Sequence, residues 1–167
     1  DRGPSVECAD VPDSHYGDGL IADEAIERLR AAQQRSDTPF FIAVGFLKPH
    51  LPFVAPKKYW DLYDPMTIPP ARNPYLPYGM PPVAFGDKSM GGFYELRDCM
   101  DFRNAPSPFA GSLTEAEQRR LKHGYYASVS FTDAQVGRVL DELDRLGLSE
   151  KTIIVLWGDH GWKLGEH

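Results

Sequence analysis

The chain has 167 residues and a formal net charge of −6; 42% of its residues are hydrophobic and 25% are charged. This composition excludes a disordered chain, which carries fewer apolar residues. The acidic balance argues against a general nucleic-acid binder, because phosphate contacts require a surplus of basic residues. The length fits one domain. No apolar run reaches the roughly 20 residues that span a bilayer, so no membrane span is expected.

The first third of the chain predicts a loop, a helix and a strand. Residues 1–18 are rich in turn-forming glycine, proline and aspartate and are expected to be a loop. Residues 20–35 carry apolar side chains at helical spacing, which predicts an amphipathic helix capped by Asp18. The continuous apolar run 40–46 then predicts a buried central strand of a parallel sheet.

The middle of the chain is dominated by proline. Residues 56–63 could form a short helix with Pro56 at its first position. Seven prolines lie between residues 65 and 82, a density that excludes regular helix. We therefore expect a surface insertion over about 64–112, with one short helix near residues 94–102.

The last third predicts a long helix followed by a second strand. Capping-box spacing occurs for Ser112 with Glu115 and for Thr114 with Glu117, and Gly147 stands where a helix ends. Residues 152–157 are a second short apolar run. The apolar stripe of the helix comprises Leu121, Tyr125, Ser128, Val129, Thr132, Val136, Val139, Leu140, Leu143 and Leu146.

Helices that alternate with short apolar runs indicate an α/β fold with a mostly parallel sheet flanked by helices. We expect residues 1–167 to belong to a single domain. Polar clusters follow both predicted strands, namely Lys48-Pro49-His50 and Asp159-His160. Because the carboxyl ends of parallel strands meet at one edge of a sheet, where ligands bind, the two clusters are expected to lie together.

Asp159 and His160 are candidate metal ligands between two glycines that permit a tight turn. A carboxylate suits Ca²⁺ or Mg²⁺, whereas an imidazole shifts the preference toward Zn²⁺ or a mixed site. The alternative is a turn aspartate that caps a helix beside a surface histidine.

Three further side chains have both a functional and a structural interpretation. His50 lies between two prolines, in a rigid stretch that suits proton transfer or anion contact, or it is a partly buried structural histidine. Lys48 could meet an anionic substrate or simply be solvated. Trp162 could form the wall of a pocket or cover the core.

The two cysteines, Cys8 and Cys99, match no CxxC spacing and could form a disulfide or remain buried thiols. The chain has no G-x-S-x-G, H-E-x-x-H, P-loop or G-x-G-x-x-G motif. It therefore carries binding groups and an acid–base candidate without an obvious nucleophile.

Three stretches resemble the iduronate-2-sulfatase-like branch of the formylglycine-dependent sulfatases. They are residues 39–53 (PFFIAVGFLKPHLPF), 125–138 (YYASVSFTDAQVGR) and 158–167 (GDHGWKLGEH). The resemblance implies an alkaline-phosphatase-like α/β fold and hydrolysis of sulfate esters of a sugar or polysaccharide. It also implies that a divalent cation, usually Ca²⁺, is bound and polarises the sulfate.

The resemblance also assigns roles to individual residues. It implies that Asp159 and His160 are metal ligands and that His50 helps the leaving oxygen to depart. Lys48, His167 and Trp162 become candidates for contacts with the sulfate or the sugar.

The nucleophile of this family is a formylglycine made from a cysteine in a Cys-x-Pro-Ser-Arg type of motif. Neither Cys8 nor Cys99 lies in such a motif. We therefore expect the chain to be an internal piece of a longer sulfatase domain, inactive alone, with its formylglycine outside these residues. The resemblance further implies maturation by a formylglycine-generating enzyme and a secreted, periplasmic or lysosome-like location.

Two alternatives remain at this point. One is a phosphoester hydrolase of the same fold with a serine or threonine nucleophile. The other is a non-catalytic carbohydrate-binding relative that has lost its nucleophile.

Overall fold

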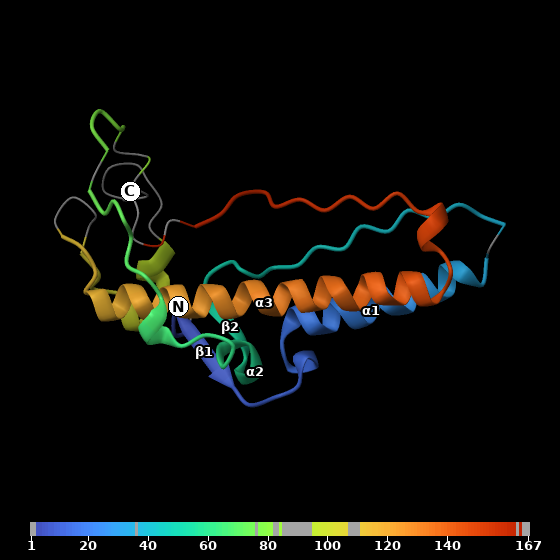
Figure 1. Ribbon diagram of the computed structural model, residues 1–167, viewed down its shortest axis with the longest axis horizontal. Coiled ribbons are helices and arrows are strands. Elements are labelled where there is room, and N and C mark those ends of the chain that lie inside the picture. Colours follow the sequence, from blue (N-terminus) through green and yellow to red (C-terminus); the bar gives the residue numbers. More distant parts are fainter. Residues whose placement is uncertain are drawn as a thin grey trace.

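The computed structural model describes residues 3–35, 37–75, 77–81, 84, 95–106, 111–162 and 164. Two long helices lie alongside each other and form the body of the molecule: α1 (Gly17–Gln33) and α3 (Glu115–Arg145) (Figure 1). Two short strands and the short helix α2 (Lys57–Trp60) pack near the middle of α3. The chain is therefore mixed α/β, as the sequence predicts.

The only sheet among the described residues is a parallel pair, β1 (Val6–Ala9) and β2 (Phe53–Pro56). Val6 is paired with Phe53 in its register. Neither strand was expected. β1 lies in the stretch predicted to be a loop, and no strand was predicted over the residues of β2. β2 pairs here because the side chain of Phe53 is buried in the core against α3.

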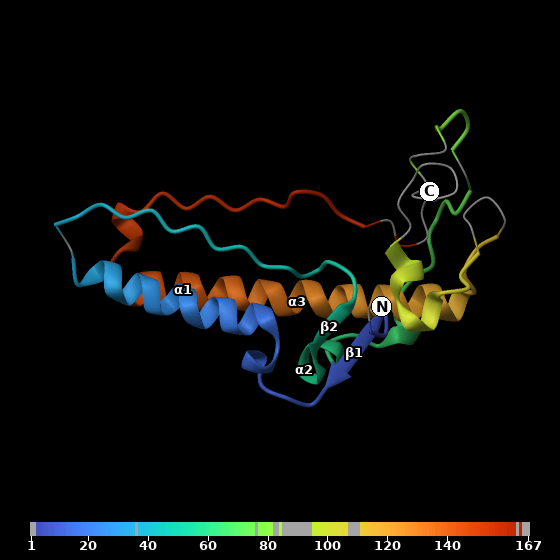
Figure 2. The ribbon, with the colours of Figure 1, turned by 180° about the vertical axis from the view of Figure 1, so that it is seen from behind.

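The prediction of buried strands at 40–46 and 152–157 is wrong for this structure. Both segments run in the same direction along the two helices (Figures 1 and 2), but neither is assigned as a strand. Phe41 is 92% exposed and Ile153 is 93% exposed. Their apolar β-branched and aromatic composition favours a sheet, but a strand also needs backbone partners, and the described residues provide none.

Helix α1 begins at Gly17, slightly before the predicted start, and buries Ala25, Leu29 and Ala32 of the predicted apolar face. The predicted capping role of Asp18 is wrong, because Tyr16 occupies the N-cap position. The backbone of this first turn lies so close to Asp13 that a Cβ at Gly19 would collide with it. A glycine is therefore required at that position.

Helix α3 is capped as the second predicted capping box indicates. Thr114 accepts a hydrogen bond from the backbone N–H of Glu117, and the Glu117 carboxylate accepts one from the backbone N–H of Thr114. After the helix, Gly147 adopts a φ of +68°. The stripe is less complete than predicted, because Val129 and Leu140 are exposed.

The core lies where α3 crosses β2. One cluster gathers Phe53 with Leu121 and residues of the insertion, and a second gathers Ala55 with Phe131 and aromatic residues of α2.

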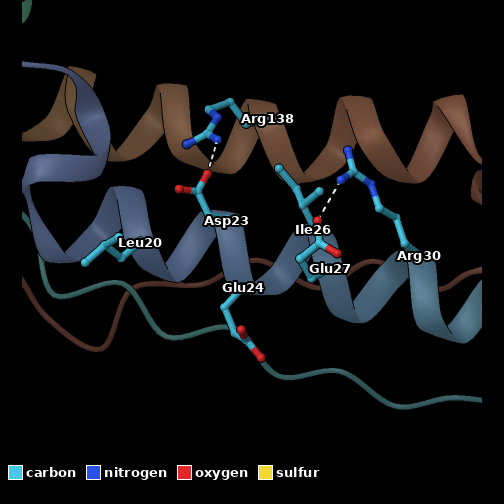
Figure 3. A pocket seen from close by; sticks show the side chains of 7 residues that line it. All are labelled: Leu20, Asp23, Glu24, Ile26, Glu27, Arg30 and Arg138. Carbon is cyan, nitrogen blue, oxygen red and sulfur yellow. Dashed lines mark hydrogen bonds and ion pairs between the residues drawn. The ribbon is translucent and has the colours of Figure 1, made fainter.

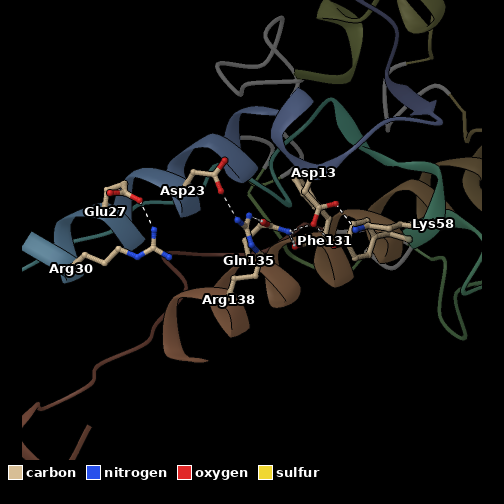
Figure 4. A network of polar contacts seen from close by, with 9 residues as sticks. Asp13, Asp23, Glu27, Arg30, Lys58, Phe131, Gln135 and Arg138 are labelled. Carbon is tan, nitrogen blue, oxygen red and sulfur yellow. Dashed lines mark hydrogen bonds and ion pairs between the residues drawn. The ribbon is translucent and has the colours of Figure 1, made fainter. Parts of the chain in front are cut away.

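The two long helices are further joined by polar contacts (Figure 4), including an ion pair between Arg138 and Asp23. Burial raises the pKa of Asp13, but hydrogen bonds from Lys58, Gln135 and Tyr59 outweigh it and lower the pKa overall.

Three 3-10 turns lie in the described part of the proline-rich insertion, and no α-helix is assigned there. They lie at Pro65–Thr67, Glu95–Asp98 and Met100–Phe102, the last two where a short helix was expected. The short helix predicted over 56–63 is present only over Lys57–Trp60, as α2, and Pro56 is its N-cap and not its first residue.

Cys8 is exposed and Cys99 is buried, and neither forms a disulfide, so the disulfide and the pair of buried thiols are both wrong as predictions. Within the described ranges, no helix is both long and apolar enough to cross a membrane.

Candidate functional site

The loop that carries Lys48 and His50 is held at several points. The carboxylate of Asp18 accepts hydrogen bonds from the backbone N–H groups of Leu47 and Lys48. Thr132 of α3 donates its hydroxyl to the backbone carbonyl of Lys48 at 3.1 Å. This loop is therefore attached to the first turn of α1 and to the middle of α3.

The ammonium group of Lys48 is directed into its own loop. Its Nζ donates to the backbone carbonyls of His50 and Pro52 at 2.9 and 2.8 Å. These hydrogen bonds stabilise the conformation of the loop around His50. Contact of Lys48 with a substrate stays a prediction.

The imidazole ring of His50 is held from three directions. Its Nδ1 lies 2.6 Å from the carbonyl oxygen of Leu51, and its Nε2 lies 3.4 Å from Oε2 of Glu95. Trp162 contacts the ring edge-to-face, with ring centroids 5.5 Å apart. The side chain of His50 is still 43% exposed, so the ring is oriented but accessible.

Trp162 brings the second predicted loop to the first. Its indole contacts His50 and also Phe53, and it packs against the core cluster that contains Leu121. A Cβ at Gly161 would lie 3.9 Å from the Tyr125 hydroxyl. The two loops therefore meet, as the sequence predicts, and Trp162 both covers the core and flanks His50.

Asp159 and His160 point outward from this second loop. The carboxylate of Asp159 is 85% exposed, and its Oδ1 accepts the backbone N–H of His160 at 2.9 Å. That hydrogen bond, together with electrostatic interaction with His160 and, more weakly, with His50, lowers the pKa of Asp159. The side chain is thus kept as a carboxylate.

The donor chemistry of this pair fits part of a divalent-cation site. Nδ1 of His160 lies 3.3 Å from the Gly161 carbonyl, which can only accept, so Nδ1 carries the proton and Nε2 keeps its lone pair. Metal-binding histidines are commonly oriented in this way. Within the described ranges, no group of three or more His, Cys, Asp or Glu side chains is arranged to hold a metal.

Comparison with known proteins identifies the family. The sequence profile described as "Sulfatase" matches residues 4–167. This chain belongs to the sulfatase family. It is 42% identical to the iduronate 2-sulfatase of Mus musculus and 40% identical to that of Homo sapiens, in each case over 97% of the chain. A "Sulfatase" of Formosa agariphila is 37% identical over 77% of it. The chain spans about 28% of the length of the two iduronate 2-sulfatases.

Sequence reasoning missed two side chains of this sulfatase-family chain that contact the histidine loop. Glu95 lies 45 positions after His50, in an insertion without periodic pattern, and nothing in its sequence context distinguishes it. The sequence predicted Asp18 only as the cap of the helix over residues 20–35. Of the predicted site residues, His167 lies outside the described residues.

A separate groove of about 520 Å³ lies between α1 and α3 (Figure 3). Its two arginines are each paired with a neighbouring carboxylate, Arg138 with Asp23 and Arg30 with Glu27. None of the predicted site residues of the sulfatase-family chain lines this groove. Its lining comprises Leu20, Asp23, Glu24, Ile26, Glu27, Arg30 and Arg138.

Proposed function

We propose that the protein containing this chain is a sulfuric ester hydrolase that removes sulfate from a sulfated sugar or polysaccharide. The observation that carries the proposal is the contact between His50 and Trp162, which joins the histidine loop to the loop of Asp159 and His160. The similarity to two iduronate 2-sulfatases supports a sulfated sugar as the substrate class. Residues 1–167 are in this proposal a single partial catalytic domain.

In this proposal His50 protonates the oxygen that leaves the sulfur. The Leu51 carbonyl accepts from Nδ1, which leaves Nε2 as the nitrogen that faces the substrate. Trp162 limits rotation of the ring, because an edge-to-face contact is lost when either ring turns. Lys48 and His167 are the proposed contacts for the sulfate or the sugar, with Trp162 beside them.

Asp159 and His160 would hold a divalent cation, Ca²⁺ in this proposal, and the remaining ligands would come from the rest of the longer protein. When bound, the cation supplies positive charge to the oxygens of the sulfate. Asp159 suits this role because it is exposed and its lowered pKa keeps it ionised.

The nucleophile is proposed to be a formylglycine made by a formylglycine-generating enzyme from a cysteine outside this chain. Neither described cysteine fits, since Cys99 is buried and Cys8 is an exposed thiol on β1 without a Cys-x-Pro-x-Arg motif. The resemblance further supports a secreted, periplasmic or lysosomal location.

The test is sulfate release by the longer protein, measured on a sulfated disaccharide and, in parallel, on a phosphate monoester and a phosphodiester. We expect sulfate release, loss of most turnover in H50A, and unchanged turnover in H15A, whose histidine is exposed in the turn before α1. Preferential phosphate release would favour a phosphoester hydrolase, and metal binding without turnover would favour a carbohydrate-binding relative. The 167-residue chain alone should release nothing from an aryl sulfate.

A further inference from the structure

The carboxylate of Glu95 faces the nitrogen through which His50 would act. Glu95 lies in the 3-10 turn Glu95–Asp98, and its Oε2 is 3.4 Å from Nε2 of His50. Resting on the proposed function, we propose that Glu95 is a positioning residue that keeps the His50 imidazole oriented, with Nε2 placed to deliver a proton to the leaving oxygen.

The two partners of the ring determine where its protons lie. A backbone carbonyl can only accept, so Nδ1 donates to Leu51. The Glu95 carboxylate lies at ion-pair distance, 3.4 Å, from Nε2, where its negative charge favours a proton on that nitrogen. A general-acid histidine delivers a proton from such a nitrogen, so Glu95 orients the atom that the proposed step uses.

The length of the second contact leaves the proton available. A charge-assisted N–H···O bond is usually about 2.7–2.9 Å long, whereas the distance from Nε2 to Glu95 is 3.4 Å. The side chain of Glu95 is 18% exposed and that of His50 is 43% exposed. The histidine therefore retains an open side from which a substrate oxygen can compete for the same N–H.

The charge of Glu95 is otherwise unfavourable at this place. A carboxylate beside a sulfate site repels the anionic substrate and weakens its binding. The other charges near the ring differ in placement: the ammonium of Lys48 is bonded to the His50 backbone carbonyl, and Asp159 acts on His50 only at longer range. In this proposal the orientation of His50 offsets that cost.

The proposed step balances in protons and electrons. An oxyanion of the proposed formylglycine nucleophile, outside this chain, supplies the electron pair of the new O–S bond. The electron pair of the breaking S–O bond, on the opposite side of the sulfur, moves to the leaving oxygen, which takes the proton from Nε2 and departs as an alcohol. The ring of His50 is left neutral, with its Nδ1 hydrogen still donated to Leu51. The departing proton thus comes from the nitrogen that Glu95 contacts.

The nature of the leaving group provides the test. A sugar alcohol is a poor leaving group and needs a proton, whereas 4-nitrophenolate leaves readily without one. In the longer protein, E95Q should therefore lower kcat on a sulfated disaccharide by about 10-fold to 100-fold, the range expected for loss of one hydrogen-bonded charge partner. It should leave kcat on 4-nitrophenyl sulfate nearly unchanged and should not raise KM for either substrate.

Three variants complete the experiment. E150Q, at an exposed glutamate in the turn after α3, should match the parent on both substrates. E95D keeps the charge and should retain more activity on the sulfated disaccharide than E95Q. The double variant H50A/E95Q should lose no more activity than H50A alone, because Glu95 acts through His50.

The outcomes separate this inference from the proposed function. Equal losses on both substrates in E95Q and E95D, or no loss on the sulfated disaccharide, overturn the role of Glu95. Additive losses in the double variant overturn it too. A parent that releases no sulfate from either substrate overturns the proposed function, and this inference with it.

Discussion

The buried carboxylate of Asp18 holds the backbone of Lys48. Its Oδ2 accepts the backbone N–H of Lys48 at 2.8 Å, and its Oδ1 accepts that of Leu47 at 2.9 Å. Asp18 is only 2% exposed, so these bonds replace the water that a charged group would otherwise keep. The first turn of α1 is thereby attached to the loop that carries His50.

The variant D18N should be destabilised by about 1–3 kcal/mol, because the amide has one acceptor oxygen and leaves a buried N–H without its partner. We expect the longer protein to lose kcat as well, since the His50 loop is less firmly held. D23N on the same helix is the control; it removes a partly exposed ion pair with Arg138 that should contribute about 0–1 kcal/mol. Urea unfolding measures both, and equal losses would contradict the role of Asp18.

A second prediction concerns two glycines of α3. A Cβ at Gly124 would lie 2.9 Å from Val6 Cγ1 and 3.0 Å from both Phe53 Cβ and an aromatic carbon of Trp60. G124A should therefore destabilise the fold by about 1–3 kcal/mol through overpacking. A Cβ at Gly137 meets nothing within 4 Å, so G137A should stabilise the helix by about 0.5–1 kcal/mol.

The free energy of unfolding of the two glycine variants, measured in urea, should therefore change in opposite directions. The same substitution at both positions cancels the intrinsic preference of alanine for helix. If both variants stabilise the protein, α3 does not approach β2 as closely as the structure shows.

The features predicted correctly from sequence are local ones. The capping box of Thr114 and Glu117 is set by residues three positions apart, and the φ of +68° at Gly147 follows from the absence of a Cβ. The cap assigned to Asp18 failed because two backbone amides some thirty residues later compete for its carboxylate. A local sequence pattern does not show that these distant amides bind the Asp18 carboxylate.

The predictions of the strands and of the site contacts both depend on groups that lie far apart in the sequence. The run 40–46 has the composition of a strand, but strand pairing depends on neighbours that composition does not specify. Proximity of the two loops was predicted from the meeting of parallel strand ends, and the loops do meet through His50 and Trp162 although neither apolar run is a strand. The contact of Glu95 with His50 was not, since it joins a proline-rich insertion to a loop 45 residues earlier.

A third prediction concerns the metal. D159N keeps a carbonyl oxygen but removes the negative charge that a hard cation prefers, so the longer protein should bind Ca²⁺ at least about 10-fold more weakly. The metal content after dialysis, measured by plasma mass spectrometry, and the rise of Tm with added Ca²⁺ should both fall. D133N, at an exposed aspartate of α3, is the control. Unchanged metal content in D159N would remove Asp159 from the site.

The last prediction is a pH dependence of stability at Glu142. Hydrogen bonds from Arg145 and then Arg30 lower the pKa of Glu142 from 4.5 to about 2. Because the carboxyl is more acidic in the folded state, its stabilisation is fully present above pH 4.5 and is lost as the pH falls toward about 2. E142Q removes this dependence, so the free energy of unfolding should fall less steeply with acid over that interval than in the parent.

The measurement is urea unfolding at a series of pH values, with E150Q as a control that should retain the slope of the parent. The comparison uses the difference between parent and variant, because other carboxylates titrate in the same interval and contribute equally to both. Above pH 4.5 that difference should be constant, since Glu142 is ionised in both the folded and the unfolded states there. Parallel curves for parent and E142Q down to pH 2 would mean that Arg30 and Arg145 do not hold this carboxylate in solution.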